Sequence, residues 1–145
     1  MKPYNKAFFG ALEGAFQILK RRYGTKATLK IMEELMERNL GAAYRAMKVK
    51  EKCAEVFKRV VGERDKAVGL RVSFHDLPNG FAYRFHTDPF PNLRGKVKHE
   101  ALDATYLNFK MRSLLGKDWR YRTTKHLWKG HAYTEHVFER TKRRK

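Results

Sequence analysis

The chain has 145 residues, and its 33 Lys and Arg outnumber its 15 Asp and Glu, which gives a formal net charge of +18. This length suits one domain, and a content of 42% hydrophobic residues excludes a disordered chain. No apolar run approaches the ~18 residues of a membrane span, and the N-terminus lacks the pattern of a signal peptide. The single cysteine, Cys53, excludes an internal disulfide. We therefore expect one cytoplasmic domain over residues 1–145, with a basic tail at about 141–145 and no membrane partner.

The excess of basic residues restricts the possible partners. A high content of Lys and Arg with one Gln and one Cys resembles the composition of thermophile proteins. Thermophile ion-pair networks also need acidic residues, and these are too few here. The surplus cations must therefore face something anionic or be tolerated as self-repulsion. Nucleic acid, an acidic partner and an anionic small ligand all fit this charge.

The first half of the chain predicts three amphipathic helices. Apolar residues recur at helical spacing over residues 5–23, again over 25–47, and a third time over 53–61. Gly24 and Gly62 stand where the first and third of these helices would end. Each apolar stripe covers one face, so we expect all three helices to pack against another layer.

The period changes from helical spacing to alternation after Val68. Residues 70–75 and 81–86 alternate apolar and polar side chains around Asn79-Gly80, a pair typical of two-residue hairpin turns. With these two as turn residues, Phe74 faces Phe85 and His75 faces Arg84. One face of the hairpin is then aromatic and directed to the core. The other face carries Arg71, Ser73, His75, Arg84 and His86.

A Pro-rich loop at 87–95, a fourth helix at about 98–115 and a second hairpin at 119–140 complete the chain. With Gly130-His131 as the turn of this hairpin, His126 pairs with Glu135 and Lys125 with His136. Neither face of the hairpin is purely apolar, a pattern typical of strands that line a polar cavity or an interface, such as that of a homodimer. The order of elements predicts an α+β fold: three N-terminal helices, then a hairpin, a helix and a hairpin that form a four-stranded, mainly antiparallel sheet packed on helices.

The second half of this order resembles a known superfamily. A hairpin, a Pro-containing loop, a helix and a closing hairpin with a Gly-centred turn are similar to those of the vinyl-4-reductase domains and the L-2-amino-thiazoline-4-carboxylic acid hydrolase-like proteins. The residues that carry the resemblance are Asp88-Pro89-Phe90, Leu102-Asp103 and 125–135 (KHLWKGHAYTE). Such domains commonly have a cysteine at the positions of Asp88 and Thr134 and near Asp103, and none of these residues is cysteine here. The resemblance implies a ligand-binding fold more than it implies hydrolase chemistry.

From these observations we expect a small-molecule-binding domain, with an anionic ligand held between the sheet and the helices. The residues expected to bind it are Arg84, His86, Lys125, His126, Glu135 and His136. The alternative is a nucleic-acid-binding protein, because aromatic residues interleaved with basic ones suit base stacking and phosphate contact. Its residues would be Trp119, Arg120, Arg122, Trp128, Lys129, Tyr133, Arg143 and Arg144.

A third hypothesis is a hydrolase in which His126 and Glu135 replace the absent thiols, since a carboxylate beside an imidazole orients it as a general base. The chain has no phosphate-binding loop, nucleophile elbow or zinc-protease motif, so we expect a binding protein rather than an enzyme. His75 and His86 share one hairpin face, but Arg84 beside them would repel a cation. We therefore assign no catalytic residue, no metal and no cofactor.

Overall fold

Three α-helices and one four-stranded sheet form the part of the chain that this computed structural model describes, residues 2–141. The predicted α+β class is therefore confirmed. In chain order the elements are α1 (Lys6–Ala46), α2 (Ala54–Ala67), β1 (Val72–Leu77), β2 (Gly80–Phe85), the short 3₁₀ helix η1 (Pro91–Leu93), α3 (His99–Leu114), β3 (Trp119–Lys125), the 3₁₀ helix η2 (Leu127–Lys129) and β4 (Thr134–Arg140).

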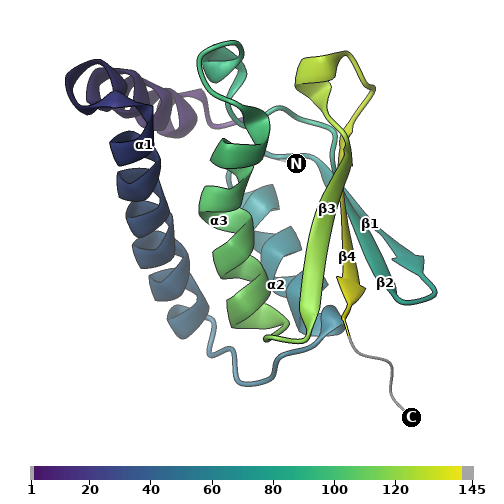
Figure 1. Cartoon of the computed structure of the whole chain (residues 1–145). Coiled ribbons are helices and arrows are strands. Elements are labelled where there is room, and N and C mark those ends of the chain that lie inside the picture. The colour runs from purple at the N-terminus through teal and green to yellow at the C-terminus, as the bar shows by residue number, and fades with distance from the viewer. Residues whose placement is uncertain (1, 142–145) are drawn as a thin grey trace.

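The strands form one antiparallel sheet in the order β1-β2-β4-β3, so the two hairpins join through β2 and β4. The helices lie on one face of this sheet, and the other face carries no helix (Figure 1). Antiparallel sheets commonly have one face packed on the core and one in contact with solvent. Within residues 2–141, no helix combines the length and the apolar character that a bilayer crossing requires.

α1 bends at Gly24, whose backbone angles (φ 84, ψ 169) are not helical. Glycine adopts this positive φ readily because it has no Cβ. The buried Thr28 donates a hydrogen bond of 2.7 Å to the carbonyl oxygen of Gly24 and so supplies a partner near the bend. The sequence predicted two helices with a break at Gly24. The structure joins them in one bent helix whose halves run in different directions (Figure 1).

The other helices match the predicted ones to different degrees. The prediction that Gly62 ends a helix is wrong, because α2 continues to Ala67. Gly62 instead lies under the sheet, where a Cβ would be 3.4 Å from the ring of Phe74. α3 ends at Leu114, one residue before the predicted end, and Gly116 follows with a positive φ of 95.

The core between helices and sheet is mainly aromatic. Phe57 of α2 is fully buried, and its ring centroid lies 5.2 Å from that of Phe81, 5.8 Å from that of Tyr83 and 5.0 Å from that of Phe138. These three partners come from β2 and β4, so one helical residue spans the central strand pair. Aromatic pairs at such separations add to the stabilisation from burial.

The first hairpin keeps its predicted faces but not its predicted register. Phe74 pairs with Tyr83 and His75 with Ala82, so each partner lies two residues from the expected one. A shift of two leaves every side chain on its face. The turn residues are Pro78 and Asn79, and Gly80 is already in β2. Glycine is needed there because a Cβ would lie 1.8 Å from the Phe138 carbonyl oxygen.

The second hairpin contains a β-bulge that the alternation does not reveal. Thr123 pairs with His136, but Lys125 pairs with Glu135, so Thr124 is an additional residue in β3. A bulge of one residue reverses the direction of every later side chain. His126, which follows β3, therefore points into the interior and is 6% exposed.

Gly80→Ala should lower the free energy of unfolding, because the β4 backbone occupies the space of the new methyl group. We expect a loss of about 3 kcal/mol or more, which is the upper end of the usual cost of overpacking or beyond it. Urea unfolding would measure this loss. The matched control is Gly14→Ala in α1, where no atom lies within 4 Å of the added Cβ. This change should raise stability by about 0.5–1 kcal/mol. An unchanged stability of Gly80→Ala would contradict the close approach of the two strands.

Candidate functional site

A cavity of about 90 Å³ lies between the helices and the sheet. Both halves of α1 line it, with Phe8, Phe9 and Leu12 before the bend and Met36 and Leu40 after it. The bend at Gly24 therefore brings two distant parts of one helix to the same space. The remaining wall comes from α2, β2, α3 and the loop before η1, with Arg64, Asp65, Val68, Leu70, Phe85, Pro89, Phe90, Tyr106 and Lys110, and α1 adds Asn39.

Asp65 and Lys110 form a buried polar pair at this cavity. Tyr83 donates a hydrogen bond to Asp65 Oδ2, and Lys110 Nζ lies 3.7 Å from Oδ1. Burial raises the pKa of Asp65 and lowers that of Lys110, while each partner's charge opposes the shift of the other. The pair adds no net charge whether it is ionised or has exchanged its proton.

Arg64 supplies the unbalanced charge of the cavity. Its Nε is buried and has no hydrogen-bond partner. The Tyr44 hydroxyl is also buried and without a partner. Burial is the larger cause of its raised pKa, and the nearby carboxylate of Asp65 raises that pKa further. With Asp65 and Lys110 neutral as a pair, Arg64 leaves one positive charge beside an apolar cavity.

A second polar cluster surrounds Asp103, farther along the sheet. Tyr106 donates to Asp103 Oδ1 at 3.0 Å, and His126 Nε2 lies 3.1 Å from Oδ2. The other nitrogen of His126, Nδ1, accepts the backbone N–H of Trp128 at 3.1 Å. His126 is therefore the Nε2–H tautomer when neutral and donates to Asp103. Both of its nitrogens are engaged, so neither is free to act as a general base.

Two more histidines approach this cluster. The ring of His99 stacks on that of His126 at a centroid distance of 4.0 Å, and both of its nitrogens are buried without a hydrogen bond. His136 Nδ1 is 2.8 Å from the Thr123 hydroxyl, while its Nε2 is unpartnered and 4.0 Å from Asp103 Oδ2. Burial lowers the pKa of His136 to about 4 and also lowers that of His99.

Unsatisfied polar atoms concentrate at these two clusters. Within residues 2–141, five buried side-chain atoms lack a hydrogen-bond partner: Tyr44 Oη, Arg64 Nε, both ring nitrogens of His99 and His136 Nε2. Two lie near Asp65 and three near Asp103. A buried polar atom without a partner costs roughly 1–3 kcal/mol, so each such atom needs an explanation, such as a catalytic role or a bound water or ion.

The six predicted ligand residues do not meet at one place. His126 and His136 lie inside, beside Asp103. The other four lie on the helix-free face, where Arg84 binds Glu135 at 2.7 Å, Lys125 donates to the Tyr133 hydroxyl at 3.0 Å and His86 contacts Ser73 at 2.8 Å. Burial acts to raise the pKa of Glu135, but hydrogen bonds from Thr124 and Arg84 hold this pKa below its ordinary value.

The predicted pairing of His126 with Glu135 is wrong. Glu135 pairs with Lys125, because a longer connection that contains η2 replaces the predicted two-residue turn at Gly130-His131. The two side chains lie on opposite faces of the sheet, so they cannot act together as the acid and base of a hydrolase.

The residues predicted for nucleic-acid binding also do not form one surface, because some are buried and others are exposed. Trp119 is 8% exposed and packs on Phe81, and the indole N–H of Trp128 donates to Asp88 at 2.7 Å. Trp119 therefore has no free ring face for a base. Arg120, Arg122 and Lys129 are exposed, Tyr133 is half-buried, and Arg143 and Arg144 lie outside the described residues.

No protein-family model matches this chain, and a comparison with curated proteins finds no match. The resemblance to the vinyl-4-reductase and thiazoline-carboxylate hydrolase group therefore stays a prediction.

Several residues of both clusters were missed from the sequence. His99 and Asp103 are four residues apart on α3 and so share one helix face, which is a usable signal. Asp65 and Lys110 gave a weaker signal, since charged residues on amphipathic helices are usually solvated. Only the packing of α2 on α3 and the sheet explains their burial.

Lys110→Met should lower the free energy of unfolding by about 3–5 kcal/mol at neutral pH, because it leaves Asp65 buried without its main cation. The folded-state pKa of Asp65 is raised above its unfolded value, so lowering the pH protonates the folded state preferentially. The loss should therefore shrink as the pH falls. Urea unfolding at two pH values measures both effects.

The double variant Asp65→Asn, Lys110→Met is the matched control, because neither buried charge remains in it. It should be more stable than Lys110→Met alone at neutral pH. If the double variant is the less stable of the two, the proposed charge pairing is incorrect.

Proposed function

We propose that this protein binds a small carboxylic acid, or a similar anion with an apolar body, in the cavity between α1, α2, α3 and β2. The observation that carries the proposal is the surplus charge of Arg64, whose buried Nε has no partner beside a mainly apolar wall in which Asp65 and Lys110 pair with each other. The binding place between sheet and helices is the one expected from the sequence, but the residues are Arg64, Asp65, Tyr106 and Lys110.

Several properties of the cavity support this class of ligand. Ligand sites are typically apolar with a few convergent polar groups, and perturbed pKa values often mark them. Phe9, Leu12 and Phe90 supply apolar wall, while Arg64 and Lys110 supply donors. A carboxylate would give Arg64 Nε an acceptor and neutralise the surplus charge, and charge-assisted bonds of this kind are strong.

The size of the cavity limits the ligand. It measures about 90 Å³, less than the ~150 Å³ of an engineered cavity that holds benzene. The enclosed part of the ligand is therefore a short apolar segment, and any longer chain must extend toward solvent near the partly exposed Phe8.

Calorimetric titration with straight-chain carboxylates and with the matched alcohols tests the proposal. Carboxylates should bind and the alcohols should bind at least ~10-fold more weakly, because a hydrogen bond to a charged group contributes about 1.5–3 kcal/mol. Arg64→Gln should remove that preference. Arg120→Gln, on the helix-free face, is the control and should leave it unchanged.

A cavity-filling variant separates binding from folding. Leu12→Phe should abolish carboxylate binding by occupying the cavity, while thermal unfolding shows that the protein remains folded. Equal affinity for acids and alcohols, or full binding by Leu12→Phe, would exclude this site.

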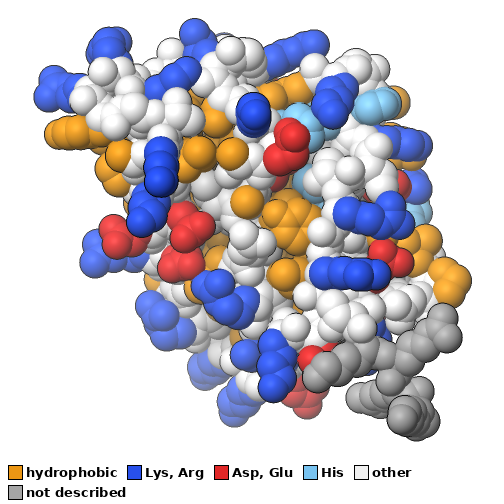
Figure 2. Space-filling model, in the orientation of Figure 1, with side chains coloured by type: hydrophobic (Ala, Val, Ile, Leu, Met, Phe, Trp, Pro, Cys, Tyr) orange, Lys and Arg blue, Asp and Glu red, His pale blue; other side chains and the backbone are white. Residues whose placement is uncertain are grey.

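A second candidate function, polyanion binding by the helix-free face, is favoured by a different observation. This face carries Arg71, Arg84, Arg120, Arg122 and Lys125, and Lys and Arg side chains lie along β3 in Figure 2. Its two acids are both paired, Glu135 with Arg84 at 2.7 Å and Glu139 with Arg122 at 3.3 Å. A groove beside β1 extends the charge with Arg59 and Lys66, although it also contains Glu63, and its Lys58 pairs with Asp76.

The tyrosine of this face is already in contact with cations, since Arg84 and Lys125 lie 4.7 and 4.9 Å from the ring centroid of Tyr133. Contacts to phosphate, rather than stacking of bases, would therefore supply the affinity. Binding of this kind is sequence-independent and weakens steeply with salt.

Fluorescence anisotropy with labelled oligo(dT) over a range of salt concentrations tests this candidate. Changing Arg71, Arg120 and Arg122 to Gln should reduce the slope of log affinity against log salt by about 2, at ~0.7 per lost phosphate contact. The control changes Arg21, Arg22 and Lys26 of α1 to Gln and removes the same charge from the other side of the sheet. Equal effects of the two triple variants would mean that net charge alone drives binding.

A further inference from the structure

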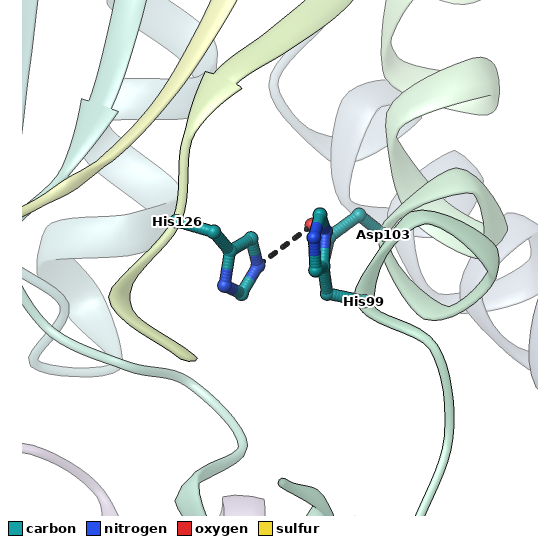
Figure 3. Close-up of side chains that lie close together, drawn as sticks. All are labelled: His99, Asp103 and His126. Carbon is teal, nitrogen blue, oxygen red and sulfur yellow. Dashed lines mark hydrogen bonds and ion pairs between the residues drawn. The ribbon is translucent and has the colours of Figure 1, made fainter. Parts of the chain in front are cut away.

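His99, Asp103 and His126 face one another at the start of α3 and the end of β3 (Figure 3). One nitrogen of each histidine and one oxygen of Asp103 all lie within 4.8 Å of one another. Two imidazoles and one carboxylate are the donor set that Zn²⁺ and related divalent transition metals prefer. We propose that these three residues bind such a metal ion.

The unsatisfied groups of the cluster support this inference. His99 is 9% exposed, yet neither of its nitrogens has a hydrogen bond. Glu100 Oε1 approaches Nε2 to 3.0 Å without hydrogen-bond geometry. A metal ion would provide the missing partner for His99. His136 Nε2, also unpartnered and 4.0 Å from Asp103 Oδ2, is a further nitrogen beside the site.

The surroundings orient the carboxylate for this role. Tyr106 donates to Asp103 Oδ1, which leaves Oδ2 directed at His126. Partners of this kind hold the ligands of metal sites in position. Ligand atoms of a tetrahedral zinc site lie roughly 3.3 Å apart, given bonds of about 2.0–2.1 Å. The His126–Asp103 separation of 3.1 Å is already close to this value, so His99 is the side chain that must move.

An open groove leads to the cluster. It has a volume of about 330 Å³ and is lined by His99, Glu100, Tyr121, Arg122, Thr123 and Lys129. Metal ions can enter there without unfolding of the protein. Arg122 and Lys129 oppose the approach of a cation, but both are exposed and therefore screened by solvent and salt.

Metal binding through His126 Nε2 has one structural consequence. The proton that Nε2 now donates to Asp103 must move to Nδ1, which displaces the hydrogen bond from the backbone N–H of Trp128. Two hydrogen bonds are lost, from His126 Nε2–H to Asp103 and from the Trp128 N–H to Nδ1, while three metal–ligand bonds form. The change of tautomer gives a signal that an ion bound elsewhere would not produce.

Titration of chelator-stripped protein with Co²⁺ tests the proposal. We expect one Co²⁺ per chain with visible absorption bands of a four-coordinate site, displaced by Zn²⁺. Imidazole ¹⁵N spectra should show His126 change from the Nε2–H to the Nδ1–H tautomer. This readout uses the unaltered chain and does not depend on the ligand proposed for the cavity at Asp65.

The variant His99→Phe keeps a ring stacked on His126 but removes its nitrogens. It should weaken Co²⁺ binding at least ~100-fold, since loss of an outer partner alone typically costs ~10–100-fold. His86→Phe is the control, because His86 belongs to the other histidine group, with Ser73 and His75 on the helix-free face. Absence of Co²⁺ binding, binding retained by His99→Phe, or binding lost in His86→Phe would each overturn the assignment.

Discussion

The buried carboxylate of Asp65 connects three elements of the protein. Its side chain accepts a hydrogen bond from Tyr83 of β2 and lies beside Lys110 of α3, and its backbone oxygen accepts from Leu70 at 2.9 Å where α2 turns into the sheet. A single charge in a dry interior is strongly unfavourable unless these partners stay in place. Asp65 therefore adds a polar link between α2, β2 and α3 to the aromatic packing around Phe57, and this link forms part of the wall of the adjacent cavity.

The bend at Gly24 completes that cavity. A straight helix of 41 residues would extend about 60 Å at 1.5 Å per residue, longer than a domain of this size. The positive φ of Gly24 folds the helix back, so that Phe9 and Leu40 line the same space. The cavity thus requires both the Asp65–Lys110 pair and the bend at Gly24, although these lie far apart in the sequence.

Periodicity and turn signals predicted the α+β class, the order of hairpin, helix and hairpin, and which residues of the first hairpin face the core, but they divided α1 at Gly24 and ended α2 at Gly62. They failed where a non-local contact decides the outcome. The Asn79-Gly80 pair predicts Gly80 as a turn residue, but Gly80 belongs to β2, where the Phe138 backbone leaves no room for a side chain. Asp103 and Lys110 were missed as site residues for the same reason, whereas the buried His126 and His136 were among the predicted ligand residues. Asp103 and Lys110 read as ordinary helix polar residues, and only tertiary packing buries them.

The bulge at Thr124 has a consequence for comparing this chain with others. Without Thr124, Lys125 would follow Thr123 directly, β3 would keep its regular alternation, and His126 would still face the interior. In a chain of the same length whose β3 pairs without the bulge, the residue aligned with His126 would face solvent and the one aligned with Lys125 would face the interior. The bulge, rather than the identity of the histidine, thus decides whether the interior gains an imidazole. Two chains with the same KHLW segment could therefore differ in interior chemistry through the pairing of β3 alone.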